Sequence, residues 1–218
     1  YTKEFRLDNG LIMASVYNEP VHYEKDGRWE DIDNTLVARI DDGNTVYTNA
    51  AGLWNVQFPQ QMSSSNPISI TKDGYTLSFR LDGELAIPGG VAVMNIGDHE
   101  ADAFTVQSAQ TSSAQIVQYQ SAVDKENAQF AETVLDKINS RLSYADVFSN
   151  TSVVYDLQSN KVKESIIMES YNDTLRGYRY TLEVGSLIPV LADDGHIDFY
   201  DENRENIVMV MPAPFLID

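Results

Sequence analysis

The chain has 218 residues, no cysteine, and 33 Asp and Glu against 15 Lys and Arg, which gives a formal net charge of −18. Disulfides and thiol catalysis are therefore excluded, and nucleic acid and anionic membranes are disfavoured as partners because both attract basic surfaces. A hydrophobic content of 43% indicates a globular chain, and no apolar run reaches the roughly 18 residues that a membrane-spanning helix needs.

Short apolar runs separated by tight-turn dipeptides make up most of the chain. Asp-Gly and Asn-Gly readily adopt the positive φ angles of two-residue hairpin turns. We therefore expect a series of β-hairpins. The dipeptides are Asn9-Gly10, Asp26-Gly27, Asp42-Gly43, Asp73-Gly74, Asp82-Gly83 and Asp194-Gly195.

Several runs alternate apolar and polar residues, which is typical of antiparallel strands with one buried and one solvated face. Trp29 and Trp54 are expected to pack in the core of such sheets. Three further runs are apolar throughout and are interpreted as central strands covered on both faces. The alternating runs are Trp54–Phe58, Tyr75–Arg80, Tyr178–Glu183 and Ile197–Tyr200, and the apolar runs are Val91–Ile96, Ser165–Met168 and Ile207–Met211.

Residues 107–142 depart from the strand pattern. Gln107–Gln120 is rich in Gln, Ser, Thr and Ala, and then Phe130, Val134, Ile138 and Leu142 recur every four residues. This apolar stripe predicts one inserted helix over residues 124–142. With about 15 short strands around it, the fold class is predicted as all-β, a large antiparallel β-sandwich. The sandwich is either one module over residues 1–218 or two packed halves, 1–105 and 106–218.

A series of blocks follows the order of blocks in one protein family. In these blocks the chain resembles the region that precedes the DNRLRE-type domain in large wall-associated and RHS (YD-repeat) proteins of Gram-positive bacteria. The resemblance covers most of the chain and is weakest between residues 86 and 140. The blocks are Pro20–Tyr23, Gly27–Leu36, Trp54–Pro59, Leu142–Phe148, Thr151–Asn160, Val162–Met168, Gly195–Tyr200 and Met211–Asp218.

This resemblance implies a secreted, cell-wall-associated, modular protein in which the chain continues past Asp218 into further β modules. It transfers no active-site residue, because the shared blocks are signatures of a fold. The first residue, Tyr1, is not Met, which fits a processed or excised piece of a larger polypeptide.

Metal sites are the first chemical candidates. His22, His99 and His196 have no spacing typical of a zinc site and are expected at the surface. Calcium prefers several hard oxygen ligands, which two acidic turns offer without the spacing of an EF-hand. Solvated turns are the main interpretation, Ca²⁺ is the weaker alternative, and no other cofactor is expected. The turns are Asp41–Asn44 and one that contains Asp193, Asp194, Asp198 and Asp201.

Catalytic motifs are not recognisable, since the sequence contains neither a GxSxG nucleophile motif nor a phosphate-binding glycine loop. Three carboxylates are candidates for a glycosidase pair, but their strand-like surroundings favour a solvated strand face. Four tyrosines are candidates for a sugar-stacking surface, although half-buried strand positions explain most tyrosines in β proteins. The carboxylates are Glu164, Glu169 and Glu183, and the tyrosines are Tyr171, Tyr178, Tyr180 and Tyr200.

The leading hypothesis is a non-catalytic structural or spacer module of a large secreted bacterial surface protein. Its expected partners are neighbouring domains of the same polypeptide and cell-wall or host glycans, with no membrane insertion. The alternative is a module that binds carbohydrate or another cell-surface partner. A carbohydrate-active enzyme domain is a third hypothesis, which requires a deep cleft with converging carboxylates.

Overall fold

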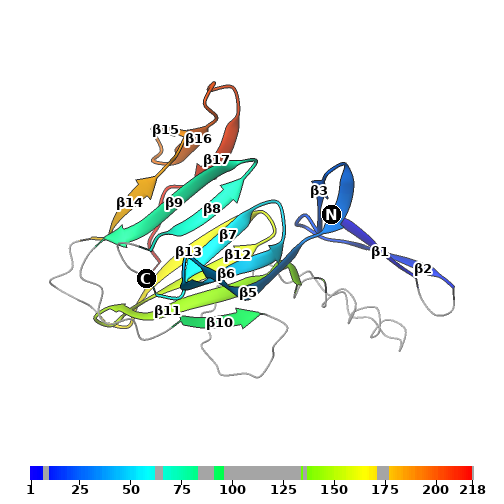
Figure 1. The fold of residues 1–218 in the computed structure, drawn as a ribbon, viewed down its shortest axis with the longest axis horizontal. Helices are drawn as coiled ribbons and strands as arrows, with labels where there is room; N and C mark the ends of the chain where they lie inside the picture. The colour runs from blue at the N-terminus through cyan, green and yellow to red at the C-terminus, as the bar shows by residue number, and fades with distance from the viewer. Residues whose placement is uncertain are drawn as a thin grey trace.

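The computed structural model describes residues 1–6, 10–61, 66–82, 134, 137–170 and 177–217, and the backbone of residues 91–95. In these ranges the chain forms β-strands that pair antiparallel in five sheets (Figure 1). The predicted all-β class is confirmed. In this part of the chain, no helix combines the length and apolar character that crossing a membrane requires.

The largest sheet has six strands in the order β14-β9-β8-β7-β6-β5. Its first five strands along the chain are joined as successive hairpins, and β14 joins the far end by pairing with β9. The strands are β5 (Asp33–Asp41), β6 (Asn44–Ala51), β7 (Asn55–Pro59), β8 (Ile68–Lys72), β9 (Tyr75–Asp82) and β14 (Arg179–Glu183).

A second sheet of four strands, in the order β10-β11-β12-β13, lies against one face of the first (Figure 1). Both sheets combine strands from either side of residue 105, because β14 pairs with β9 and β10 pairs with β11. The strands are β10 (Val91–Asn95), β11 (Ser140–Phe148), β12 (Thr151–Gln158) and β13 (Lys161–Met168).

Three small sheets complete the described structure. A three-stranded sheet follows β14, and two hairpins precede β5 and lie at the N-terminal end (Figure 1). The strands are β15 (Ile188–Leu191), β16 (Ile197–Tyr200) and β17 (Ile207–Met211) in the former, and β1 (Thr2–Arg6), β2 (Ile12–Val16), β3 (His22–Lys25) and β4 (Arg28–Asp31) in the hairpins.

Asp-Gly dipeptides close three of the hairpins in the predicted way. Asp26, Asp42 and Asp73 have φ angles of 52°, 46° and 53°, and the glycine after each also has a positive φ. Two consecutive positive φ angles define the turn whose twist matches antiparallel strands. Lys25 pairs with Arg28 and Asp41 pairs with Asn44, so in each hairpin the Asp-Gly dipeptide alone lies outside the strand pairing. Gly83 and Asn9 lie outside the described residues.

The core fills the space between the two large sheets. Alternate residues of β9 point inward, so that Leu77, Phe79 and Leu81 are buried, and β12 contributes Tyr155 in the same way. The Tyr155 ring lies 5.4 Å from the ring of Phe58 and 6.2 Å from that of Phe79, measured between centroids. Burying side chains of this size stabilises the sandwich by about 1.5–3 kcal/mol each.

A second buried cluster lies where the N-terminal hairpins meet the start of β11. It contains Tyr17, Val21, Tyr23 and Ile32 from the N-terminal region together with Val134 and Ile138. The expected helix over 124–142 lies mostly outside the described residues. Its predicted end is wrong, because residues 140–142 are already the first residues of β11.

Three runs predicted as central strands are end strands of their sheets. The runs Val91–Ile96, Ser165–Met168 and Ile207–Met211 correspond to β10, β13 and β17. In β17 a register shift opposite β16 lets two consecutive residues face the core, which explains an apolar run without cover on both faces.

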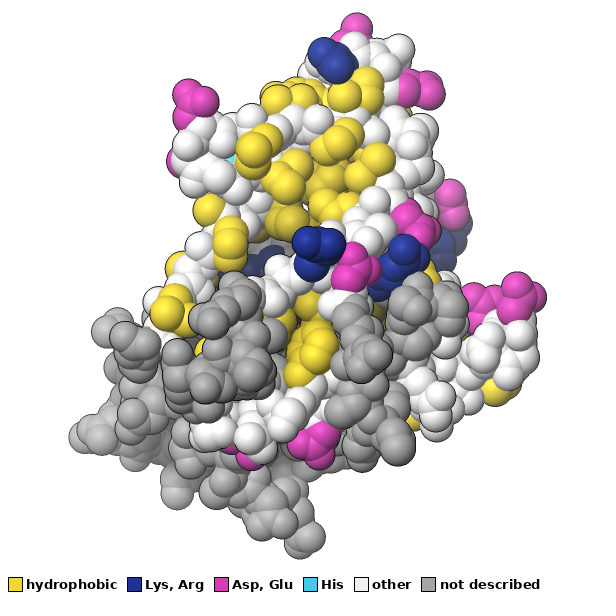
Figure 2. All heavy atoms as spheres, turned by 90° about the vertical axis from the view of Figure 1, so that its left-hand side faces the viewer, with side chains coloured by type: hydrophobic (Ala, Val, Ile, Leu, Met, Phe, Trp, Pro, Cys, Tyr) yellow, Lys and Arg dark blue, Asp and Glu magenta, His cyan; other side chains and the backbone are white. Residues whose placement is uncertain are grey.

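Hydrophobic side chains accordingly remain at the surface of the three-stranded sheet. Ile207 and Val210 of β17 are 48% and 54% exposed. Figure 2 shows hydrophobic side chains gathered on the upper part of this face, at the height where β15–β17 lie in Figure 1. The predicted core position of Trp29 is also wrong, since its side chain is 73% exposed on β4, whereas Trp54 packs against the core.

Candidate functional site

A carboxylate between the two large sheets has the most unusual environment among the sequence candidates. Glu164 lies on β13 with Val162 and Ile166 two residues to either side, and both of these pack against the core. Because side chains alternate along a strand, Glu164 faces the same interior. The predicted solvated position of Glu164 is therefore wrong. The alternation of Val162, Glu164 and Ile166 along the strand was the sequence signal that Glu164 faces inward.

Two tyrosine hydroxyls hold the Glu164 carboxylate. Tyr155, its cross-strand partner on β12, donates to Oε2 over 2.5 Å, and Tyr180 of β14 donates to Oε1 over 2.6 Å. Burial raises the pKa of Glu164, although both hydroxyl hydrogen bonds oppose that shift. Burial and the neighbouring carboxylate raise the pKa of both tyrosines. The three residues thus form a polar bridge from one sheet of the sandwich to the other.

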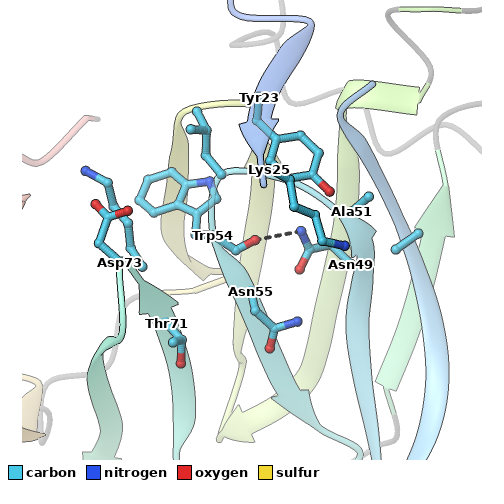
Figure 3. Close-up of a pocket in the computed structure, with 12 residues that line it drawn as sticks. Tyr23, Lys25, Asn49, Ala51, Trp54, Asn55, Thr71 and Asp73 are labelled. Atoms are coloured by element: carbon cyan, nitrogen blue, oxygen red, sulfur yellow. Dashed lines mark hydrogen bonds between the residues drawn. The ribbon is translucent and has the colours of Figure 1, made fainter. Parts of the chain in front are cut away.

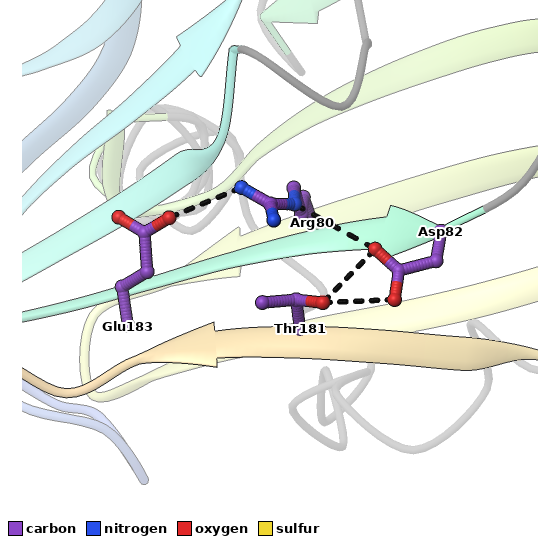
Figure 4. Close-up of polar contacts among 4 residues, drawn as sticks. All are labelled: Arg80, Asp82, Thr181 and Glu183. Atoms are coloured by element: carbon purple, nitrogen blue, oxygen red, sulfur yellow. Dashed lines mark hydrogen bonds and ion pairs between the residues drawn. The ribbon is translucent and has the colours of Figure 1, made fainter.

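The other carboxylate candidates lie elsewhere. Glu183 is on the outer face of β14, where its Oε1 accepts a hydrogen bond of 3.1 Å from Nη1 of Arg80 (Figure 4). Beside this pair Thr181 donates to Asp82, whose Oδ1 is 3.6 Å from Nε of Arg80. Glu183 and Glu164 therefore point to opposite faces of the sheet that contains β14, and the arrangement is not a glycosidase pair.

A cluster around His196 occupies the loop between β15 and β16. Its Nδ1 is 2.5 Å from Oδ1 of Asp194, and its Nε2 is 3.4 Å from Oδ2 of Asp198. The hydrogen bond that His196 makes to the Asp194 carboxylate is the main cause of a raised pKa for His196. The two carboxylates therefore favour the charged imidazolium.

The remaining calcium candidates do not join this cluster. Asp201 accepts hydrogen bonds of 2.8 Å from the backbone N of Glu205 and from Nδ2 of Asn206, which close the turn between β16 and β17. Asp193 is exposed beside Asp194. Among the residues that the structure describes, no three His, Asp or Glu side chains are placed to hold a metal ion.

The other sequence-predicted residues are dispersed. His22 lies on β3 with Nε2 at 3.1 Å from Oδ1 of Asp31, far along the chain from the His196 loop, and His99 is outside the described residues. Asp41–Asn44 forms the solvated hairpin tip between β5 and β6.

The four tyrosines proposed as a stacking surface do not form one in the described part of the chain. Tyr178 and Tyr180 are partly buried and pack against the core. The Tyr178 ring lies 5.8 Å from that of Phe148, between centroids. Tyr200 is partly buried on β16, and Tyr171 lies outside the described residues.

A pair of buried asparagines was not recognised in the sequence. Nδ2 of Asn34 donates to the backbone oxygen of Ile138 over 2.8 Å, and Oδ1 of Asn34 accepts from Asn49 over 3.2 Å. Asn49 also donates to the backbone oxygen of Trp54 and accepts from the backbone N of Val56, each over 2.9 Å. Both side chains lie in otherwise unremarkable strand sequences, so no pattern distinguished them from solvated asparagines.

An open hollow of about 310 Å³, which Asn49 helps to line, lies at the end of the six-stranded sheet (Figure 3). Three chain segments form it: β3, the connection from β6 to β7, and the turn from β8 to β9. Aromatic and charged side chains stand together in it, with Tyr23 and Trp54 as the rings and Lys25, Lys72 and Asp73 as the charges. Some of the polar groups of the lining already have partners within the protein, since Nδ2 of Asn55 donates to Oγ1 of Thr48 over 2.9 Å and Nζ of Lys72 donates to the backbone oxygen of Val208 over 2.8 Å.

Comparisons with protein-family models, with curated protein sequences and with solved structures found no match to this chain.

Proposed function

We propose that this chain is a non-catalytic structural module of a large secreted bacterial surface protein. Its role is to fold stably and to hold neighbouring domains of the same polypeptide at the cell wall. The order of sequence blocks from Pro20–Tyr23 to Met211–Asp218 supports this proposal through the resemblance described above.

The observation that carries the non-catalytic part of the proposal is the engagement of Glu164. A catalytic carboxylate needs at least one oxygen directed at a reacting atom. Both oxygens of Glu164 instead accept hydrogen bonds from Tyr155 and Tyr180, which belong to opposite sheets. This carboxyl group, whose pKa is raised by burial, therefore serves the sandwich itself.

The proposal is tested in the bacterium that carries the gene, with an antibody raised against this chain. We expect the antibody to detect a polypeptide much longer than 218 residues in the wall or culture fraction. Trypsin treatment of intact cells should remove that signal while a cytoplasmic marker protein remains. A protein of the chain's own size inside trypsin-resistant cells would overturn the proposal.

A further inference from the structure

The β1–β2 hairpin has one half-buried face and one exposed face. On the inner face Phe5 packs against the second buried cluster, and Lys3 forms an ion pair with Asp31 of β4. On the outer face Ile12 and Val16 of β2 are 62% and 79% exposed. Figure 1 shows both strands extending away from the two large sheets. β2 therefore lies where a second molecule can reach it.

The backbone of β2 also has an unpaired edge, since in the described part of the chain only β1 pairs with it. The N–H of Tyr17 donates to the oxygen of Tyr1 over 2.7 Å, and hydrogen-bonded pairs recur at every second residue of an antiparallel ladder. The register with β1 then makes Ser15 and Met13 the next bonded residues of β2. The residues between them direct their N–H and C=O groups away from β1. The free groups of this edge belong to Ile12, Ala14 and Val16.

Most other end strands of the described sheets contain a charged residue or a proline, both of which discourage the addition of a further strand. β10 and β17 contain neither, but β10 contacts β5, and in β17 the backbone oxygen of Val208 accepts a hydrogen bond from Nζ of Lys72. β2, with the sequence IMASV, has no charge and no proline, and alternate residues along it are exposed. Its edge is thus open to pairing with another chain.

The free edge of β2 is complementary to itself. Two copies related by a two-fold axis at Ala14 pair antiparallel, with Ile12 of one copy opposite Val16 of the other. Every residue that meets a partner in this register has its N–H and C=O groups free, so the pairing forms about six hydrogen bonds. It also joins two two-stranded sheets, which are marginally stable alone, into a single larger sheet.

The local charge of the hairpin permits two copies of this acidic chain to meet. The whole chain has a net charge of −18, and like charges oppose association. β1, however, carries Lys3 and Arg6 against Glu4, and β2 carries no charge. In the paired sheet the two Glu4 residues are three strand spacings apart, roughly 14 Å. That separation exceeds the Debye length of about 8 Å at physiological salt, so their repulsion is screened.

We therefore propose that β2 is a dimerisation edge, which pairs antiparallel with β2 of a second copy of this chain. Ile12, Ala14 and Val16 of the two copies then form one continuous apolar stripe. The contact is small, so the dimer is weak, with a Kd on the order of 50 µM. It is independent of the structural role proposed above, and either can fail without the other.

Sedimentation velocity at concentrations from well below to well above that Kd tests the proposal. Ala14→Pro removes the central N–H of the free edge, which has no partner on β1, so the hairpin keeps its own hydrogen bonds. Glu4→Pro is the matched control, because Glu4 lies directly opposite Ala14 and its N–H faces the other edge of the hairpin. We expect Ala14→Pro to weaken dimerisation by at least about ten-fold and Glu4→Pro to change it by less than about two-fold.

A disulfide gives a second readout, because the chain has no cysteine. Ala14→Cys places one thiol of each copy at the two-fold axis, where opposite Cα atoms are about 5.5 Å apart and a disulfide fits. Glu4→Cys, an exposed position on β1, is the control. Under mild oxidation we expect Ala14→Cys to form covalent dimers at least about ten-fold faster than Glu4→Cys.

Three results would each overturn the proposal. The first is a chain that stays monomeric at every concentration, which would leave the edge of β2 to a strand of a different protein. The second is an equal effect of Ala14→Pro and Glu4→Pro on dimerisation. The third is equal cross-linking of the two cysteine variants.

Discussion

The hydroxyl of Tyr155 donates a hydrogen bond of 2.5 Å to Oε2 of Glu164, the residue directly opposite it in the pairing of β12 with β13. Tyr180 reaches the other oxygen of the same carboxylate from the six-stranded sheet. A single acidic side chain thus receives one donor from each layer of the sandwich. Because a buried charge is costly even when it is hydrogen-bonded, the contribution of this bridge to stability must depend on pH.

Glu164→Gln should stabilise the protein at neutral pH by roughly 1 kcal/mol. Burial raises the folded-state pKa of Glu164 above its ordinary value of 4.5. The folded state then binds the proton more tightly than the unfolded state, so the contribution of Glu164 to stability is fully present below pH 4.5 and is lost as pH rises through the folded pKa. Glutamine keeps one acceptor and adds a donor. Because it does not titrate, it removes the pH dependence of stability that Glu164 causes.

Urea denaturation of both proteins between pH 4 and pH 8 measures this effect. The stability difference between Glu164→Gln and the unchanged chain should be small at the acid end and should grow with pH. Glu183→Gln controls for the loss of one negative charge, since it alters a carboxylate on the outer face of β14. A Glu164→Gln variant that is less stable than the unchanged chain at pH 8 would show that the ionised bridge is net stabilising.

Tyr180 on β14 and Tyr178 just before it should differ in how much stability the protein loses when the hydroxyl is removed. Tyr180→Phe leaves Oε1 of Glu164 without its donor and should cost about 1–3 kcal/mol. Tyr178→Phe should be neutral or slightly stabilising, because the buried Tyr178 hydroxyl has no hydrogen-bond partner in the described structure. Thermal unfolding of the two variants measures the difference. Equal losses of stability in Tyr180→Phe and Tyr178→Phe would contradict the role given to the bridge.

Local sequence rules predicted the parts of this fold that depend on neighbouring residues. The Asp26-Gly27, Asp42-Gly43 and Asp73-Gly74 turns were recognisable because the dipeptide alone sets the backbone conformation. Alternation in β9 likewise predicted its buried face. The position of a strand within a sheet depends on residues far away in the chain, and for that reason β10, β13 and β17 were misplaced in the centre.

The candidate site was less predictable than the fold, because its residues come from separate segments. Tyr23, Trp54 and Lys72 share no motif, and they meet only when β3, the connection from β6 to β7, and β8 are assembled. Trp29 and Trp54 also look alike in the sequence, yet one is exposed and the other packs against the core. An alternating pattern identifies two faces of a strand without showing whether another layer covers one of them.

The buried asparagine pair should be essential to the sheet beneath the hollow. Asn49→Ala removes the partner of the Val56 amide and of the Trp54 carbonyl, and should destabilise the protein by roughly 3 kcal/mol. Asn44→Ala at the exposed hairpin tip is the matched control and should change stability by less than about 0.5 kcal/mol. Chemical denaturation followed by circular dichroism compares them, and a similar small effect in both would refute the assignment.

The pKa of His196 should lie above its ordinary value of 6.5. Asp194 and then Asp198 raise the pKa of His196, so the interactions that favour its charged form are present below the ordinary histidine pKa of 6.5 and are lost as pH rises through the folded pKa. Proton NMR titration of the imidazole measures this pKa directly. Asp194→Asn should lower it more than Asp198→Asn, because Asp194 supplies the larger interaction, and the reverse order would contradict this geometry.

The turn between β8 and β9 offers a test of backbone conformation without a packing effect. Gly74 has a φ of 83°, and a Cβ atom added there would meet no heavy atom within 4 Å. Gly74→Ala should therefore reduce stability by about 1 kcal/mol. The sole cause is that residues with a Cβ atom disfavour the left-handed backbone conformation. Gly74→Asn should lose less, since asparagine tolerates the left-handed conformation better than alanine. Urea denaturation of the two variants gives the comparison. An alanine variant at least as stable as the asparagine variant would show that steric freedom, rather than φ, governs this turn.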